Sequence, residues 1–153
     1  MPTPKLPAEG GCRCNRVRFR ITAPPLFTAA CHCTGCQKMS SSAFSLTAAV
    51  PQDGFEVIAG ETVIGGMHGE LQHHFCAWCM SWMFTRAEMM PFVNVRPTML
   101  DDASWFVPFI ETVTKEELPW ATAPAERSYE GFPPMEEFGE LLTAYRAFAA
   151  DAS

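Results

Sequence analysis

Hydrophobic and polar residues alternate strictly near the N-terminus, in the segment RVRFRIT at residues 16–22. Val17, Phe19 and Ile21 fall on one side of this segment, and three arginines fall on the other. Successive side chains of a strand point to opposite faces, so this period of two predicts a half-buried strand with a basic, solvent-facing side.

Similar short extended runs recur along the chain, and Gly, Pro and Asp, which favour turns, lie between them. This spacing predicts a mainly β fold of several small coiled antiparallel sheets. The runs occupy residues 43–50, 55–60, 71–75, 81–85, 92–95 and 105–110.

The pattern changes towards the C-terminus. Residues 118–134 contain four prolines, which interrupt strand pairing, so we expect this segment to form a strap over the domain. In residues 135–150 hydrophobic positions recur three to four apart, which predicts one amphipathic helix. The sequence leaves open whether this helix docks on its own domain or pairs with a second subunit in a homodimer. Its apolar positions are Met135, Phe138, Leu141, Leu142, Tyr145 and Phe148.

The composition suits one globular domain. Of 153 residues, 48% are hydrophobic and 18% charged, and a chain of this length can bury about 70% of the surface exposed when it is unfolded. The formal net charge of -6 opposes binding to nucleic acid, so we expect a small molecule or a protein as partner. No stretch resembles a signal peptide or approaches the roughly 18 apolar residues of a membrane span, which favours a cytoplasmic protein without membrane contact.

Seven cysteines lie in three close-spaced groups. An odd number in a chain without an export signal argues against a disulfide framework and favours thiolates that bind metal. Cys12 and Cys14 form a CxC pair, and Cys76 and Cys79 form a CxxC pair. Two such pairs are the usual ligands of structural zinc, so we assign these four residues to one closed zinc site, which would contribute to the folding free energy.

The remaining cysteines are Cys31, Cys33 and Cys36, and we expect glycine in the intervening residues 34–35 to let the chain turn so that the three sulfurs meet. Three protein ligands with one open position is the coordination of catalytic zinc, which gives two zinc ions per chain. Three alternatives stay open. A histidine or carboxylate could close the site, the thiols could be redox-active, or the group could recruit Cys76 or Cys79.

Side chains near the cysteines are expected to have structural roles. His32 should point away from the metal and orient its loop, because neighbouring residues of an extended segment face opposite ways. Of His73 and His74, one should face the core and the other solvent. Three aromatic residues should pack around the closed zinc site and shield it from water. These are Trp78, Trp82 and Phe84.

With the cysteines grouped in this way, the chain resembles the glutathione-dependent formaldehyde-activating enzyme family, which includes centromere protein V-like members. The matching segments are GGCRCNRVRFRI (10–21), CHCTGCQKMSSSAF (31–44), HFCAWC (74–79), VNV (93–95) and PWATAPAERSYEGFPP (119–134). The resemblance implies an Mss4-like zinc-binding domain over about residues 8–134, including the strap at 118–134, with the helix at 135–150 outside it. It also implies the same two sites, a closed zinc on Cys12, Cys14, Cys76 and Cys79 and an active zinc on Cys31, Cys33 and Cys36.

The activity that the resemblance implies is the addition of glutathione to formaldehyde, or the reverse cleavage of a carbon–sulfur bond. Two positions depart from the family pattern. Met80 stands where the family usually has glycine, which argues against a left-handed backbone there. Gln37 and then Lys38 stand where the family often has arginine. Lys38 is a candidate for binding an anionic group of the thiol.

The leading hypothesis is therefore a zinc-dependent carbon–sulfur lyase-type enzyme that binds glutathione or a related thiol at the three-cysteine zinc and acts on a small aldehyde. Two other classes of protein compete with it. One is a non-catalytic, zinc-stabilised protein-interaction module, which the acidic charge and the terminal helix would suit. The other is a redox sensor, in which oxidation of the three cysteines would release metal.

Overall fold

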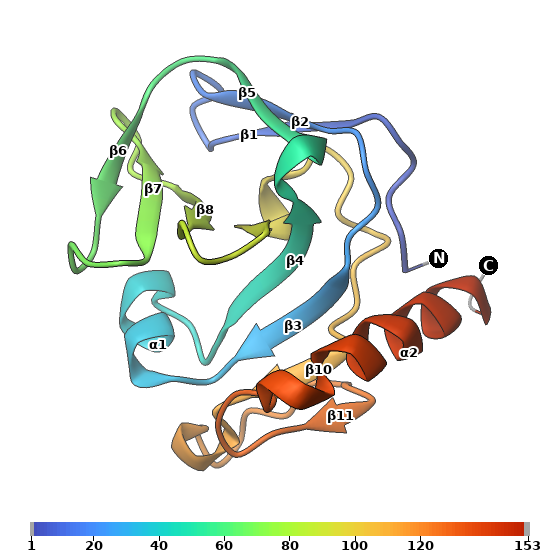
Figure 1. Ribbon diagram of the computed structural model, residues 1–153. Helices are drawn as coiled ribbons and strands as arrows, with labels where there is room; N and C mark the ends of the chain where they lie inside the picture. Colours follow the sequence, from blue (N-terminus) through green and yellow to red (C-terminus); the bar gives the residue numbers. More distant parts are fainter. Residues whose placement is uncertain (1, 152–153) are drawn as a thin grey trace.

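A small antiparallel sheet covers one end of the molecule. The computed structural model describes residues 2–151, and these residues form two β-sheets and a long C-terminal helix (Figure 1). The mainly β fold predicted from the short extended runs is therefore confirmed. The smaller sheet contains β1 (Ala8–Gly11), β2 (Arg18–Ile21) and β5 (Phe55–Ala59), with β2 in the middle.

The larger sheet holds the other strands of the described residues. They are β3 (Phe27–Cys31), β4 (Ser45–Pro51), β6 (Thr62–Gly65), β7 (Gln72–Cys76), β8 (Trp82–Arg86), β9 (Phe92–Val95), β10 (Ile110–Thr112) and β11 (Arg127–Ser128). Their order across the sheet is β11-β10-β3-β4-β9-β8-β7-β6. The sheet is mixed, because β10 pairs in parallel with both β3 and β11.

The helices occupy two positions. The short α1 (Thr34–Ser40) connects β3 to β4, and α2 (Phe138–Asp151) ends the described chain. A 3-10 turn at Met135–Glu137 precedes α2, so the predicted helix begins three residues later than the hydrophobic period suggested. Further 3-10 turns lie at Gln52–Gly54, Pro97–Met99 and Thr114–Glu116.

The prediction of a strand at residues 105–110 is wrong for most of that range. Only Ile110 lies in a strand, because Pro108 has no N–H to donate and Phe109 donates its N–H to Thr28 outside the ladder. From Ile110 to Thr112 the chain runs alongside Ala29 to Cys31. This parallel pairing brings β10 to the strand that carries the first cysteine of the triplet.

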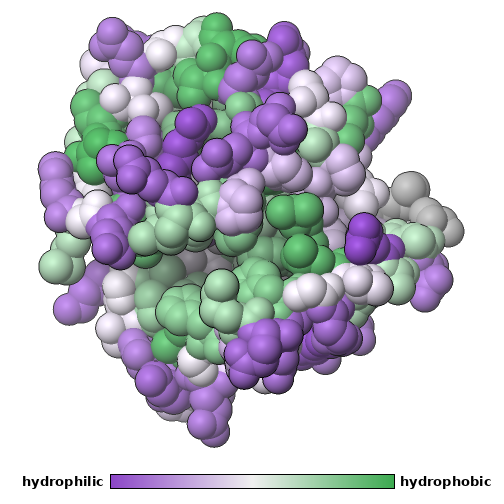
Figure 2. Space-filling model, viewed as in Figure 1, coloured by the Kyte–Doolittle hydropathy of each residue, from purple (hydrophilic) through white to green (hydrophobic). Residues whose placement is uncertain are grey.

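Two hydrophobic clusters lie on opposite sides of β4. Ala48 and Val50 face the first cluster, which fills the space between the two sheets, whereas Ala49 faces the second. The second cluster also contains Leu141 and Tyr145, one helical turn apart on α2. The helix thus docks on its own sheet, on the face opposite the small sheet. On the side of the molecule seen in Figure 2, hydrophobic surface gathers in a band across the middle with hydrophilic residues around it.

The arginines of β2 do not form a free basic surface. Arg18 makes a two-pronged ion pair with Asp101, with the shorter contact at 2.6 Å. Arg20 reaches Glu9 and Glu56, each at 3.3 Å. These carboxylates neutralise the charge that the alternating sequence placed on this face.

Replacing Tyr145 tests the docking of α2. Its ring is 1% exposed, packs against Phe109, and its hydroxyl donates to the carbonyl of Pro2 at 3.1 Å. Tyr145→Ala should lower the free energy of unfolding by about 3–5 kcal/mol, and Tyr145→Phe by about 1 kcal/mol, in urea titrations. The exposed Thr143→Ala serves as the control. Equal stability of Tyr145→Ala and the control would mean that α2 does not pack on this sheet.

Candidate metal centres

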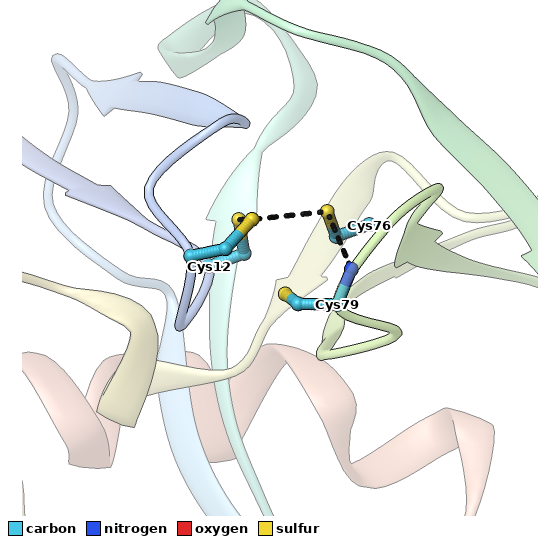
Figure 3. Close-up of side chains that lie close together, drawn as sticks. Cys12, Cys76 and Cys79 are labelled. Atoms are coloured by element: carbon cyan, nitrogen blue, oxygen red, sulfur yellow. Dashed lines mark hydrogen bonds between the residues drawn. The ribbon is translucent and has the colours of Figure 1, made fainter.

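Four thiols from two distant segments meet between the sheets. Cys12 and Cys14 lie in the turn after β1, and Cys76 and Cys79 lie at the end of β7 and in the turn that follows. Figure 3 shows the side chains of the two segments pointing toward one another. The four sulfurs lie within 4.8 Å of one another, with 3.5 Å between Cys12 and Cys14 and 3.7 Å between Cys14 and Cys76. The structure thus brings together all four residues that the sequence assigned to a closed site.

The spacing and donors of this group fit zinc. Tetrahedral zinc about 2.3 Å from each of four sulfurs holds neighbouring sulfurs about 3.8 Å apart. Backbone N–H groups also point at the sulfurs. Val17 donates to Cys12, and Trp78 and Cys79 both donate to Cys76, each at 3.4 Å. Such bonds stabilise negative charge on sulfur, which the thiolate ligands of a metal carry.

The Cys79 thiol shows the same preference for the charged form. Burial acts to raise its pKa, but a hydrogen bond with Ser81, at 3.2 Å between the sulfur and the hydroxyl oxygen, and a backbone bond from Cys14 outweigh it. The resulting pKa is about 5. A thiol with this pKa is a thiolate at neutral pH, the form that binds metal.

Two expectations about the surroundings of this group are wrong. Met80 adopts the left-handed conformation, with φ of 60°, although a side chain disfavours it. Its N–H closes the turn on the carbonyl of Cys76 at 3.1 Å, so the turn imposes the conformation. Trp78 is 64% exposed and lies 4.0 Å from the Arg16 guanidinium, whereas Trp82 and Phe84 are buried as expected. Trp78 therefore does not shield the thiols.

The second group lies where β3 meets α1. Cys31 ends β3, Cys33 caps α1, and Cys36 lies in its first turn, all three half-buried. Their sulfurs lie within 4.8 Å of one another. The Cys33 sulfur accepts a hydrogen bond from the Cys36 N–H at 3.3 Å. Helix capping therefore brings the third sulfur back, where we had expected the conformational freedom of Gly35, which lies in the helix.

Hydrogen bonding within the triplet favours one thiolate. A bond from Cys36 lowers the pKa of Cys31 to about 5, and the same bond raises the pKa of Cys36. Burial raises the pKa of Cys33. Within residues 2–151, no histidine, carboxylate or further cysteine joins this group, and Cys76 and Cys79 belong to the other. The donor set fits a metal held by three protein thiolates with a fourth position open.

A buried histidine and a buried carboxylate support the loop of the triplet. His32 is fully buried, and its Nε2 lies 2.8 Å from an oxygen of Glu111 on β10. The Ser128 hydroxyl donates to the other oxygen at 2.6 Å. With the exposed Glu117, His32 and Glu111 form a third group of possible ligand atoms within 4.8 Å. Sequence reasoning missed Glu111, whose signal is a single carboxylate within the apolar run FVPFIETV.

The two other histidines have polar partners of their own. The Nδ1 atoms of His73 and His74 lie 2.9 Å from the hydroxyls of Thr85 and Thr62. Both rings are half-buried, so the expectation that one faces the core and the other solvent is wrong. Neither histidine belongs to a cysteine group.

Gln37 ties α1 to a distant segment. Its Nε2 donates to the carbonyls of His32, at 2.7 Å, and Glu116, at 3.0 Å. The next residue, Lys38, is exposed and lines an open hollow of about 540 Å³ beside α1. Leu118 and Trp120 form its opposite side. The candidate anion-binding residue therefore lines a hollow beside the helix that carries Cys36.

A family model described as glutathione-dependent formaldehyde-activating enzyme matches residues 7–116. The chain belongs to this family. The match contains all seven cysteines and ends at residue 116, before the strap and before α2.

One similar protein carries the family's name, and one solved structure has a similar fold. A protein of Penicillium rubens named "Putative glutathione-dependent formaldehyde-activating enzyme" is 26% identical over 117 residues, which cover 69% of this chain and 60% of that protein. This chain thus matches about three fifths of that relative's length. A crystal structure of a Rhodobacter sphaeroides protein has a similar fold, with a TM-score of 0.51 at 18% identity, covering 61% of this chain and 87% of the other. Among the described residues, neither helix has the length and hydropathy needed to cross a membrane.

Met80 allows a test of the turn that carries Cys76 and Cys79. Met80→Gly should raise the free energy of unfolding by about 0.5–1 kcal/mol in urea titrations, because relief of the left-handed strain exceeds the extra entropy of glycine in the unfolded chain. Met80→Ala keeps Cβ and should retain the wild-type stability. If both variants unfold at the same urea concentration, the turn is not left-handed in solution.

Proposed function

We propose that the chain is a zinc-dependent carbon–sulfur lyase-type enzyme that adds glutathione or a related thiol to formaldehyde or another small aldehyde, or catalyses the reverse. The observation that carries this proposal is the convergence of the three sulfurs of Cys31, Cys33 and Cys36 without a fourth protein ligand among the described residues. Four ligands would favour a structural role, whereas three leave a position for substrate. The family supports the same reading.

Two zinc ions per chain would have different roles. The site of Cys12, Cys14, Cys76 and Cys79 has its full set of protein ligands, so we assign it to the stability of the fold. Zinc bound by Cys31, Cys33 and Cys36 would accept the sulfur of a substrate thiol in its open position and stabilise the negative charge on that sulfur. His32 and Glu111 would hold the loop of these ligands in place, because their contact joins it to β10.

The reaction requires one bond to form and one proton to move. The sulfur of the thiolate attacks the carbonyl carbon, and a carbon–sulfur bond forms while the carbon–oxygen π bond breaks. The oxygen keeps that electron pair and takes up the proton that the thiol has lost. The product with formaldehyde is S-hydroxymethylglutathione, and the reverse reaction breaks the same bond. Lys38, which lines the hollow beside α1, would attract a carboxylate of glutathione.

Two further features belong to the proposal. A cytoplasmic location, where glutathione is abundant and thiols stay reduced, would suit this chemistry. A homodimer through α2 would have to use its outer side, because Leu141 and Tyr145 on the inner side are buried in the chain's own second cluster.

Elemental analysis tests the separate zinc sites. The purified protein should contain about two zinc ions per chain, and Cys36→Ser should contain about one, because the triplet would lose a ligand while the four-cysteine site stays complete. Thr34→Ala, an exposed change on the same turn of α1, should keep both ions. One zinc ion in all three proteins would remove the basis of the proposed activity.

Cobalt in place of zinc tests the thiol. Glutathione at millimolar concentration should change the visible spectrum of the cobalt protein, whereas S-methylglutathione, which has no thiol to ionise, should not. Lys38→Gln should weaken glutathione binding, because a positive charge is lost, and leave binding of the uncharged thiol 2-mercaptoethanol unchanged. An unchanged spectrum with glutathione would refute thiol binding at the metal.

A further inference from the structure

Arg96 carries a buried charge without a carboxylate partner. It follows β9 directly, is only 8% exposed, and forms no ion pair within residues 2–151. The ion-paired arginines of the described chain, such as Arg18 and Arg127, are instead partly exposed. A buried charge is costly unless an opposite charge compensates it. A negative group near Arg96 would therefore lower the cost of burying its charge.

Neutral groups hold the guanidinium of Arg96 in a fixed orientation. One terminal nitrogen donates to the Leu46 carbonyl at 3.0 Å and to the Thr47 hydroxyl at 2.8 Å. The other donates to the Thr85 hydroxyl at 3.0 Å, and the plane stacks 3.8 Å from the centre of the Trp82 ring. The Nε atom is buried and has no hydrogen-bond partner among the described residues. These contacts position the charge but do not neutralise it.

The triplet lies near enough to Arg96 for the charge of a thiolate there to act on the guanidinium. Burial lowers the pKa of Arg96 to about 10, and the charges of Cys36, Cys31 and Cys33 oppose this shift. The strand register explains the proximity. Leu46, which binds Arg96, follows Ser45, and Ser45 lies directly opposite Cys31 in the pairing of β3 with β4. The guanidinium thus lies at the end of the strand pair from which the triplet emerges.

We infer that Arg96 is the counter-charge of the three-cysteine site, held by Thr47, Thr85 and Trp82 so that its field stabilises three thiolates and a metal at that site. This inference rests on the proposed zinc. Three thiolates and a divalent ion carry a net charge of -1, which Arg96 balances. Binding of a substrate thiolate would then give the region a net charge of -1, whereas without Arg96 the net charge would be -2. Arg96 therefore favours an anionic fourth ligand. Arg96 does not touch the sulfurs and acts as a positioning residue through its charge.

Zinc affinity measured with a chromophoric chelator tests this role. Arg96→Met removes the charge and should loosen the more weakly held zinc ion about 10- to 100-fold, the range typical of changes to residues that support metal ligands. Arg96→Lys loses the stacking and the forked hydrogen bonds but keeps the charge, so it should retain the zinc affinity even where urea unfolding shows lower stability. Arg86→Met is the matched control, because Arg86 also faces aromatic rings without an ion pair in the described chain.

The lysine variant separates a charge effect from a packing effect. If Arg96→Lys loosens zinc as much as Arg96→Met, or if Arg96→Met binds zinc as tightly as the wild type, the inference is wrong. Retention of the tightly held zinc ion reports that each variant is folded. If Arg96→Met also loses the tightly held ion, it is replaced by Arg96→Gln, which keeps two hydrogen-bond donors without the charge. The same zinc affinities then support or refute the inference.

The wild-type protein separates this inference from the proposed function. A single zinc ion in the wild type would refute the proposed active site and, with it, the role of Arg96. Two ions in the wild type with equal affinity in Arg96→Met would refute the role of Arg96 alone.

Discussion

The convergence of two cysteine pairs at one point is the constraint on which the rest of the fold depends. Cys14 and Cys76 are 62 residues apart in sequence, yet their sulfurs lie 3.7 Å apart. This contact fixes the turn after β1 against the turn after β7 and so joins the small sheet to the far part of the large one. Cys12 and Cys76 are also members of the hydrophobic cluster between the sheets, so the thiols and the core hold the same two elements together.

The second cysteine group depends on different elements. Its sulfurs come from the end of β3 and the first turn of α1, and β10 supplies Glu111, which contacts His32. The parallel pairing of β10 with β3 is what places Glu111 beside His32. The rigid part of the site is thus built from segments about 80 residues apart, whereas its three sulfurs come from one short stretch. This explains why the three cysteines can be found by their spacing in the sequence, whereas the residues that hold their loop cannot.

The sequence predicted features that depend on local spacing. The strict alternation around Phe19 marks β2, the period of three to four marks α2, and the cysteine pairs mark both thiol groups. It missed β3, because Thr28, Ala29 and Ala30 are buried on both faces of the sheet and give no alternation. It also missed β11, whose two residues are too few to form a pattern.

The remaining errors arise where contacts distant in sequence decide the outcome. Nothing in the sequence singled out Arg96, which Trp82 and two threonines enclose. Met80 takes a left-handed conformation because the turn between β7 and β8 demands it. Trp78 was expected to pack around the thiols, but the turn directs its side chain outward onto Arg16.

The hydrogen bonds of Gln37 mark a boundary between the three cysteines and the hollow beside α1. Gln37 and the N–H of Thr34 bind Glu116, so α1 is fastened to the chain just before the strap begins. Leu118 and Trp120, which line the hollow, come after this fastening point. Substitutions there would reshape the hollow without moving the sulfurs. The surface beside α1 can therefore vary in evolution while the thiol cluster stays the same.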